Sequence, residues 1–456
     1  MSLHPIAGIV LLLGLLGCLF ASLRFYQRQY HPHPELVRKL MHIGTGLVAL
    51  TLPWLFSTPW PVVTLAALSV GAMLVVRHVQ LARDAVGDVV HGVDRKSEGE
   101  VYFPIAVASL FYLAQGKPVL YVVPILLLTV ADALAALIGV RYGTRKFTTF
   151  DGTKKSFEGS AAFFVVAFLA THVVVLLGSD VGRAESVLIG LQMGALIMLV
   201  EAVAWRGLDN LFVPLFAYAV LHDSLDLGAA QLGMRLALLI GLWLVVSAWR
   251  RETALDSSGL IMGILILYAT GVLGGLRWLV TPLLAFSAYA LLWPRNGAAA
   301  DGIATPTPRP YNLDAVLAVN GPGLFWLLMH ARLPQLGLLY AFVLAYAIEL
   351  ALIGRATPPK TPGVETWRQN TRAVSVLAWA LVFLPFPFLS GLTGRSLLLA
   401  LVGLPIVLAG VAAFSYAWKT LQFERLSTRR WIVQAAIGAL GSFIGLVVAQ
   451  TLSGPD

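Results

Sequence analysis

The most regular feature of the chain is the recurrence of apolar runs, each about 20 residues long, separated by short polar breaks rich in glycine, proline and charged residues. A helix of about 20 residues spans the hydrocarbon core of a bilayer, and only helices or closed barrels satisfy every backbone polar group there. The pattern predicts an all-α fold, a polytopic integral membrane helical bundle with about 14–16 transmembrane helices. The clearest runs are residues 5–22, 61–76, 119–140, 159–177, 187–204, 232–249, 373–390, 396–418 and 431–451.

Composition supports a membrane protein and argues against a nucleic-acid partner. Hydrophobic residues make up 58% of the 456 residues and charged residues only 12%, which leaves too little polar surface to cover a water-soluble globule. The formal net charge of +9 comes from cations spread between the apolar runs, not from one basic face or tract, so no nucleic-acid partner is predicted. Membrane lipids are the expected surroundings.

The distribution of cations predicts the orientation of the chain in the membrane. If the N-terminus lies outside, the odd-numbered gaps between runs face the cytoplasm, and these gaps hold most of the 32 Lys and Arg residues, as the positive-inside rule requires. The first apolar run has no cation before it and Arg24 after it, the reverse of a cleavable signal peptide. We therefore expect a retained first helix, an outside N-terminus and cytoplasmic catalytic loops.

Two breaks in composition divide the chain into three expected parts. Residues 1–250 should form a membrane catalytic domain, 251–310 two spans and a cytoplasmic linker, and 311–456 a second membrane half. Ionisable residues at membrane depth are concentrated in the first part. Chemistry is therefore expected there.

The two halves share short strings that are consistent with an internal repeat. "ADALAALIGV" (131–140) and "YAIELALIGR" (346–355) both contain "ALIG", although such strings also recur by chance in membrane helices. A true repeat would align Asp132 with Ala347, so the second copy would lack the acid.

The carboxylate of Asp132 is the first candidate for chemistry. It lies within the apolar run "PILLLTVADALAALIG", where an ionised side chain costs about 2.5–3.5 kcal/mol to insert and usually faces a cavity. Ala135, Ala136 and Gly139 share its helical face, so a ligand or another backbone can approach closely. The alternative is an acid that pairs with a buried arginine and only holds helices together.

A second acidic cluster lies in "EAVAWRGLDN", where Glu201 is inside a span and Asp209 and Asn210 follow the break at Gly207. Oxygen ligands from two inner helix ends suit a Mg²⁺ that carries a nucleoside triphosphate. The metal-ligand candidates are therefore Asp132, Asp209 and Glu201. The alternative for Asp209 and Asn210 is a helix N-cap, which favours these residue types.

A basic loop that contains several glycines, "RYGTRKFTTFDGTKKSFEGS" (141–160), lies on the same side of the membrane as these acids. Lys154 and Lys155 directly precede a helix predicted to begin near Ser156, where free backbone N–H groups and the helix dipole favour phosphate. The nucleotide-binding candidates in this loop are Arg141, Lys154, Lys155, Glu158 and Gly159. The alternative is a solvated loop, since inner loops are basic in any case.

Two more stretches face the same side. Arg38 and His42, four apart in "RKLMHIG", share one helical face at the mouth of the second apolar run and are nucleotide-binding candidates, as is Asn210. The alternative for the first two is an ordinary positive-inside cluster. In "DRKSEGEVYFP", Glu98 and Glu100 are candidates for a functional role, whereas Ser97 followed by Glu100 is also a capping box.

Five segments in a fixed order together resemble the integral-membrane polyprenol kinases, which comprise phytol kinase, dolichol kinase and the CTP-using diacylglycerol kinase. The segments are "RKLMHIGTG", "GEVYFP", "ADALAALIGVRYG", "KKSFEGS" and "GLDNLFVPL". The resemblance implies CTP as the phosphoryl donor and an isoprenoid or lipid alcohol as the acceptor. It also implies nucleotide and metal contacts for Asp132, Lys154, Lys155, Glu158, Asp209 and Asn210.

The C-terminal half is similar to the membrane family that includes the plant phytyl-phosphate kinase. The similarity lies in "SSGLIMGILILYATGVLGGLRWLVTPLLAFSAYALL" and "YNLDAVLAVNGPG". The acidic stretch of that family is reduced here to "YAIELALIG", which leaves only Glu349. We therefore expect this half to be degenerate or structural.

These features predict a CTP-dependent kinase that phosphorylates a membrane isoprenoid alcohol at the cytoplasmic leaflet. Transfer would be in line, with lysines and Mg²⁺ spreading the charge of the triphosphate and Asp132 or Asp209 orienting or deprotonating the hydroxyl. One alternative is a lipid-phosphate cytidylyltransferase, which releases pyrophosphate where a kinase releases CDP. Another is a transporter or lipid scramblase without catalysis, although the ionisable residues crowd the inner helix ends and leave no polar path across the bilayer.

Overall fold

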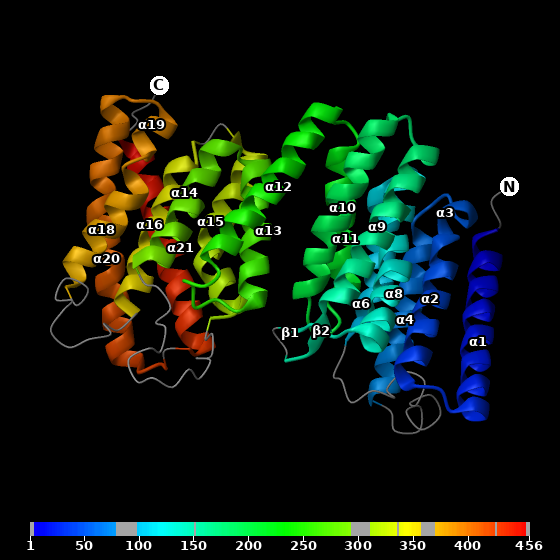
Figure 1. Cartoon of the computed structure of the whole chain (residues 1–456). Helices are drawn as coiled ribbons and strands as arrows, with labels where there is room; N and C mark the ends of the chain where they lie inside the picture. The colour runs from blue at the N-terminus through cyan, green and yellow to red at the C-terminus, as the bar shows by residue number, and fades with distance from the viewer. Residues whose placement is uncertain are drawn as a thin grey trace. The chain divides into compact units, whose positions relative to one another are not determined.

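The computed structural model describes residues 4–78, 98–149, 152–292, 311–334, 337–356, 370–424 and 426–452. These residues are helical apart from turns and one pair of short strands (Figure 1), which confirms the all-α class. Within them, eleven helices are long and apolar enough to cross a membrane, and three shorter apolar helices accompany them. The predicted number of 14–16 spans is reached only if the three shorter helices are counted as well.

Two compact units make up the chain, unit 1 (Met1–Ala237) and unit 2 (Leu238–Asp456). The elements of unit 1 are α1 (Pro5–Tyr30), α2 (Pro34–Leu50), α3 (Leu52–Leu55), α4 (Trp60–His78), α6 (Gly99–Ala114), α7 (Pro118–Leu126), the π-helix η1 (Leu127–Ala131), α8 (Asp132–Tyr142), β1 (Lys146–Thr148), β2 (Lys154–Ser156), α9 (Phe157–Gly178), α10 (Arg183–Val203) and α11 (Asp209–Ser224). The boundary falls within α12 (Ala229–Trp249). The remaining elements of unit 2 are α13 (Ser257–Leu273), α14 (Leu276–Leu292), α15 (Leu313–Arg332), α16 (Leu339–Ala356), α18 (Thr371–Phe383), α19 (Phe386–Ser390), α20 (Gly394–Leu421) and α21 (Thr428–Thr451).

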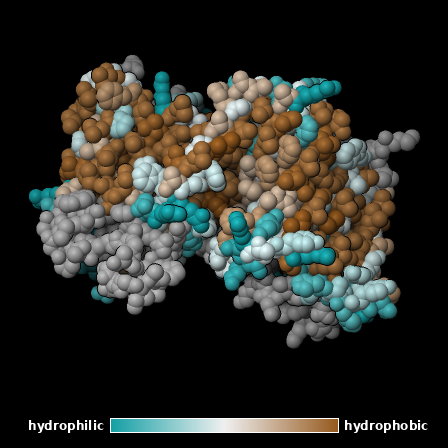
Figure 2. All heavy atoms as spheres, viewed as in Figure 1, coloured by the Kyte–Doolittle hydropathy of each residue, from teal (hydrophilic) through white to brown (hydrophobic). Residues whose placement is uncertain are grey.

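The outside of the helices is apolar, as contact with lipid requires. Figure 2 shows hydrophobic residues over the helix surfaces of each unit and hydrophilic residues gathered near the helix ends. Large apolar side chains are exposed on α1, α9 and α20, for example Val10, Leu169 and Leu401. An apolar surface of this extent is a liability in water and is the normal outer face of a protein in a bilayer. The chain is therefore a multi-pass membrane protein.

The centre of unit 1 is formed by α10 and by the continuous helix α7–η1–α8, which are its most buried spans. Small residues allow close packing there. A Cβ atom added to Gly190 or Gly194 of α10 would lie 3.0 Å from the backbone carbonyl oxygens of Phe168 and Phe164 of α9. Such glycine contacts are the usual way that membrane helices approach one another. The two acids within spans, Asp132 and Glu201, thus belong to central helices.

A π-helical turn, η1, directly precedes Asp132. The helix that begins at Pro118 contains Pro124, widens over Leu127–Ala131 and returns to α geometry at Asp132. Hydropathy does not predict this turn, because a π-turn leaves no signature in the apolar pattern. Single π-turns inside α-helices occur frequently at functional sites.

The basic loop of residues 141–160 contains a short antiparallel strand pair rather than irregular chain alone. Lys146 pairs with Ser156, Phe147 with Lys155 and Thr148 with Lys154. Residues 150–151 lie outside the described part of the chain. Ser156 is the N-cap of α9, and its hydroxyl accepts a hydrogen bond from the backbone N–H of Gly159 at 3.1 Å. The predicted helix start near Ser156 is therefore confirmed.

In unit 2, α16 is the central helix and packs against α15, α18, α20 and α21. The carboxylate of Glu349 is fully buried and accepts a hydrogen bond from Gln434 Nε2 at 2.7 Å. A Cβ atom added to Gly438 would clash with Glu349 Oε1, so a larger residue there would displace this carboxylate. The degenerate or structural role of this half and the internal repeat stay predictions.

Candidate active site

One large cavity, of about 910 Å³, lies in unit 1, at the upper end of the usual range for ligand sites. All five segments quoted from the sequence contribute to its wall. Of the sequence-predicted site residues, those that line it are Arg38, His42, Asp132, Lys154, Lys155, Gly159, Glu201, Asp209 and Asn210. The tertiary fold thus gathers residues from α2, α8, β2, α9, α10 and α11 around one space.

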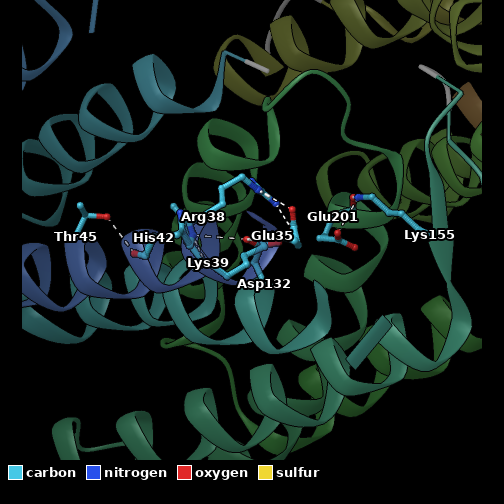
Figure 3. A network of polar contacts seen from close by, with 9 residues as sticks. Glu35, Arg38, Lys39, His42, Thr45, Asp132, Lys155 and Glu201 are labelled. Carbon is cyan, nitrogen blue, oxygen red and sulfur yellow. Dashed lines mark hydrogen bonds and ion pairs between the residues drawn. The ribbon is translucent and has the colours of Figure 1, made fainter. Parts of the chain in front are cut away.

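Asp132 forms a buried ion pair with Lys39 of α2 in the wall of this cavity (Figure 3). Lys39 Nζ donates to Asp132 Oδ2 at 2.6 Å, and both side chains are almost completely buried. The partner is a lysine, not the arginine that the sequence suggested as an alternative. Because a buried charge without a partner is costly, each side chain compensates the charge of the other, and the contact links α2 to α8.

His42 lies beside this pair and is held by the π-turn. Its Nε2 is 2.8 Å from the carbonyl oxygen of Leu128 and 3.6 Å from Asp132 Oδ2. A carbonyl oxygen only accepts hydrogen bonds, so Nε2 carries the hydrogen. Leu128 belongs to η1, and the wider turn before Asp132 therefore also orients the imidazole of His42.

Arg38 and Glu35 form a two-pronged ion pair at the start of α2. Arg38 Nε donates to Glu35 Oε2 at 3.0 Å and Arg38 Nη2 donates to Oε1 at 2.6 Å. Both residues line the cavity, and the guanidinium remains partly exposed. Paired geometry of this kind fixes a guanidinium in a plane, which suits it to hold phosphate oxygens.

The two lysines of β2 differ in their contacts. Lys155 Nζ donates to Glu201 Oε1 at 2.7 Å and also to the backbone carbonyl oxygen of Glu201, so it clamps the buried end of α10 (Figure 3). Lys154 is exposed, lines the cavity and has no ion pair within the described residues. Lys154 is therefore the cation of this strand that is open to an anionic ligand.

Glycines bring the strand pair and the start of α9 against α8. A Cβ atom added to Gly159 would lie 2.8 Å from the carbonyl oxygen of Ala135, and one added to Gly139 would lie 2.9 Å from Ser156 Oγ. The face of small residues predicted beside Asp132 (Ala135, Ala136 and Gly139) thus packs against the backbone at the start of α9 and also lines the cavity. A larger residue at Gly159 would force α8 and α9 apart, and one at Gly139 would displace the Ser156 hydroxyl.

Asp209 and Asn210 are the first residues of α11, and neither caps it. The N-cap is Leu208, without a side-chain capping bond, so the capping alternative does not describe this structure. Asn210 is buried and its Oδ1 has no hydrogen-bond partner among the described residues, although it belongs to a cavity-lining side chain. An unpaired amide oxygen in a cavity wall is free to accept from a water molecule or to contact a ligand.

The turn before α11 is tied to the start of α6. Arg206 and Gly207 both have positive φ angles, of 52° and 84°, and the backbone N–H of Glu98 donates to the carbonyl oxygen of Arg206 at 3.0 Å. Hydrogen bonds from Tyr102 and from Arg77 lower the pKa of Glu98. Glu100 lines the cavity, and Ser97 lies outside the described residues.

Two predicted nucleotide-binding residues do not line the cavity. Arg141 is exposed, with its guanidinium 5.4 Å from the ring centroid of Tyr142. Glu158 accepts hydrogen bonds from Thr144 Oγ1 at 2.5 Å and from the backbone N–H of Arg145 at 3.2 Å. Glu158 therefore organises the loop that carries the lysines, and ligand contacts by these two residues stay predictions.

The donor set favours a metal ion that arrives with a nucleotide over one held by the protein alone. Among the described residues, no three His, Cys, Asp or Glu side chains are grouped closely enough to hold a metal. Asp132 and Glu201 each face a lysine. Mg²⁺ commonly takes only one or two carboxylates and completes its shell with phosphates and water, so Asp209 with Asn210 Oδ1 fits that requirement best.

A second part of the cavity wall is mostly apolar. It is made by α1, α2, α3, α4 and α6, through Leu12, Leu16, Gly17, Phe20, Val48, Ala49, Leu52, Val62, Leu65, Ala66, Ser69, Ala72, Met73, Phe103 and Val107. One continuous space therefore joins a cationic end, where phosphates are stabilised, to an apolar slot that suits a hydrocarbon chain. Helix α2 contributes to both parts, with Arg38 and Lys39 near its start and Val48 and Ala49 near its end, and His42 lies between these positions in the sequence.

Sequence reasoning missed Lys39, although it lies inside the quoted segment "RKLMHIG". The i,i+4 spacing singled out Arg38 with His42, while Lys39 lies three residues before His42 and shares that face equally well. The available signal was a lysine leading into an apolar helix. Lys146 and Glu35, which also line the cavity, carry no distinguishing local pattern.

Comparison with known proteins supports this site. The chain is similar to the phytol kinase of Synechocystis sp., with 30% identity over 203 residues, which are 44% of this chain and 84% of that protein. No family model matches the chain. No solved structure matches it.

Proposed function

The chain belongs to the phytol kinase family, and from that premise we propose that it uses CTP and Mg²⁺ to phosphorylate a long isoprenoid alcohol at the cytoplasmic leaflet. It is a phosphotransferase with an alcohol acceptor, carried by a multi-pass membrane fold. The observation that carries the proposal is one continuous cavity in unit 1 that is lined by cations in one part and by apolar side chains in another. A lipid alcohol needs both environments at once, with its hydroxyl at the junction.

Asp132 is the proposed base. The alcohol oxygen attacks the γ-phosphorus, the bond from that phosphorus to the β–γ bridging oxygen breaks, and CDP leaves. The hydroxyl proton passes to the Asp132 carboxylate, which Lys39 holds in place at 2.6 Å. His42, fixed by the carbonyl oxygen of Leu128, keeps the carboxylate at the junction of the two parts of the cavity.

Cations at the other end of the cavity hold the triphosphate. Arg38 and Lys154 are the proposed phosphate contacts, because both line the cavity and remain accessible. Preorganised cations lower the barrier by stabilising the charge that develops on the transferred group. Lys155 takes part indirectly, since its ammonium is already shared with Glu201.

Asp209 and Asn210 would hold Mg²⁺, which neutralises charge on the β- and γ-phosphates when bound. The buried, unpartnered Oδ1 of Asn210 supports this assignment. Asp209 is the carboxylate beside it at the start of α11.

The distribution of cations along the chain supports the cytoplasmic leaflet as the place of the reaction. The cavity's cations lie in inter-span segments that the positive-inside rule assigns to the cytoplasm. CTP is also a cytoplasmic solute, so its site must open on that side.

The experiment is a transfer assay with purified protein and CTP labelled in the γ-phosphate or, separately, in the α-phosphate. Acceptors are phytol, geranylgeraniol, a long polyprenol and diacylglycerol, and ATP and GTP are tested as competing donors. The expected result is γ-label in an isoprenoid monophosphate and stoichiometric CDP. Release of pyrophosphate with α-label in the lipid would instead identify a cytidylyltransferase, and absence of any transfer would refute the proposal.

A further inference from the structure

The apolar slot has an open end and a closed end, and we propose that it measures the length of the acceptor's isoprenoid chain. The inference rests on the proposed function, because it specifies which alcohols the same site accepts.

The direction of the slot is given by α4. Arg77, in the last turn of α4, lies 3.3 Å from Glu98 at the start of α6, so this end of α4 is beside the cationic part of the cavity. Met73 lines the slot near that end, and Val62 lines it eleven residues earlier. At 1.5 Å per residue the slot runs for about 16 Å along the helix.

The far end of the slot is closed by buried side chains. Leu12, Leu52 and Val62 line it from three different helices and are at most 5% exposed. Behind them Phe56 packs against α1 so tightly that a Cβ atom added to Gly8 would lie 2.7 Å from its ring. A hydrocarbon chain that fills the slot must therefore stop at these residues.

The near end is bordered by small residues of two helices. Gly17 of α1 and Ala72 of α4 both line the slot and are both exposed. Because both residues are small and exposed as well as lining the cavity, we place the entrance for the alcohol between these two helices. A lipid alcohol can enter there from the membrane without passing through the closed end.

The length of the slot selects a particular chain. A single-bonded zigzag advances about 1.2 Å per bond, as in an extended polypeptide, so one isoprene unit of four main-chain bonds occupies about 5 Å. Beyond the unit that bears the hydroxyl, a slot of about 16 Å takes three more units. The preferred acceptor therefore has four units, as phytol and geranylgeraniol do, and a long polyprenol must bend out between α1 and α4.

The test shortens the slot with Ala66→Trp. Ala66 lines the slot seven residues from Met73, about 10 Å along the helix, which leaves room for two units beyond the first. We expect kcat/KM with geranylgeraniol and phytol to fall at least about tenfold, while farnesol, one unit shorter, keeps its wild-type value within about threefold. The matched control is Ala67→Trp, because Ala67 is the next residue, is exposed and does not line the slot.

Val62→Ala makes the opposite change at the closed end. It should raise kcat/KM for a five-unit alcohol relative to geranylgeraniol by several-fold, since it removes part of the wall that the fifth unit meets. If the wild-type protein phosphorylates alcohols but Ala66→Trp lowers farnesol and geranylgeraniol equally, the slot does not measure length. If no alcohol is phosphorylated by the wild-type protein, the proposed function itself has failed.

Discussion

Asp132→Asn has an effect on stability that can be worked out from its contact with Lys39. The substitution leaves the Lys39 ammonium, whose side chain is 3% exposed, without the carboxylate that compensates it. Removing one partner of a buried ion pair costs about 3–5 kcal/mol. If Asp132 had no ion-pair partner, the same substitution would relieve the cost of burying its charge and leave folding intact. Because Lys39 is present, the substitution is instead expected to lower the free energy of unfolding.

The same substitution should also abolish catalysis, because an amide cannot accept the hydroxyl proton. Loss of a general base lowers kcat by about 10²–10⁴-fold. A fall in activity alone would be ambiguous, since a destabilised protein also loses activity. A second variant is needed to separate the two effects.

The separating variant is Lys39→Met combined with Asp132→Asn, which leaves neither charge in the cavity wall. We expect Asp132→Asn and Lys39→Met each to lower the free energy of unfolding by about 3 kcal/mol or more, and the double variant to lose much less than their sum. Turnover should stay abolished in the double variant. The measurements are SDS titration of the purified protein in detergent micelles and the labelled-CTP transfer assay.

Two results would refute this reasoning. An additive double variant would show that Lys39 and Asp132 are not coupled, which contradicts their 2.6 Å contact. Near-normal turnover of the double variant in a folded protein would exclude Asp132 as the base. Glu35→Gln is the control, because its pair with Arg38 is partly exposed and should contribute about 1 kcal/mol or less.

Three further predictions concern the lysines of β2 and unit 2. Lys154→Ala should raise KM for CTP about tenfold or more and leave KM for the alcohol unchanged in steady-state kinetics; a shifted KM for the alcohol would contradict the assignment. Lys155→Ala should instead lower the thermal unfolding temperature, because Glu201 loses its partner. Glu349→Gln should leave the rate of phosphorylation unchanged, since Gln434 Nε2 still finds an acceptor. Mass spectrometry of the lipid product of the unmodified protein should show only a monophosphate. A lipid diphosphate that disappears with Glu349→Gln would show that unit 2 is a second kinase. A chain ending near residue 250 keeps the whole cavity of unit 1, so membranes containing it should retain alcohol kinase activity, and its complete loss would show that unit 2 is required.

The sequence by itself determined the features that depend on neighbours along the chain. Runs of apolar residues require transmembrane helices because the bilayer leaves no other way to satisfy the backbone. The start of α9 was predictable because Ser156 precedes an apolar run and caps the N–H of Gly159. The cytoplasmic side of the five segments, inferred from cations that alternate with spans, stays a prediction.

Only the tertiary structure decided which side chains meet. Lys39 and Asp132 are 93 residues apart, and Lys155 and Glu201 are 46 apart. Each contact depends on which faces of two helices pack together, and one apolar run carries little information about its partner. Glycines such as Gly159 allow two helices to approach closely, but the glycine alone does not specify which helix packs against it.

The π-turn and the slot are tertiary features for the same reason. Hydropathy gives η1 no signal, because a single wide turn changes the direction of side chains without changing their polarity. The slot is bounded by α1, α2, α3, α4 and α6, so its length is a property of how five helices pack, not of any one of them. Local composition thus determines that the chain is a membrane protein, whereas the placement of Asp132 beside a cavity of defined depth depends on long-range packing.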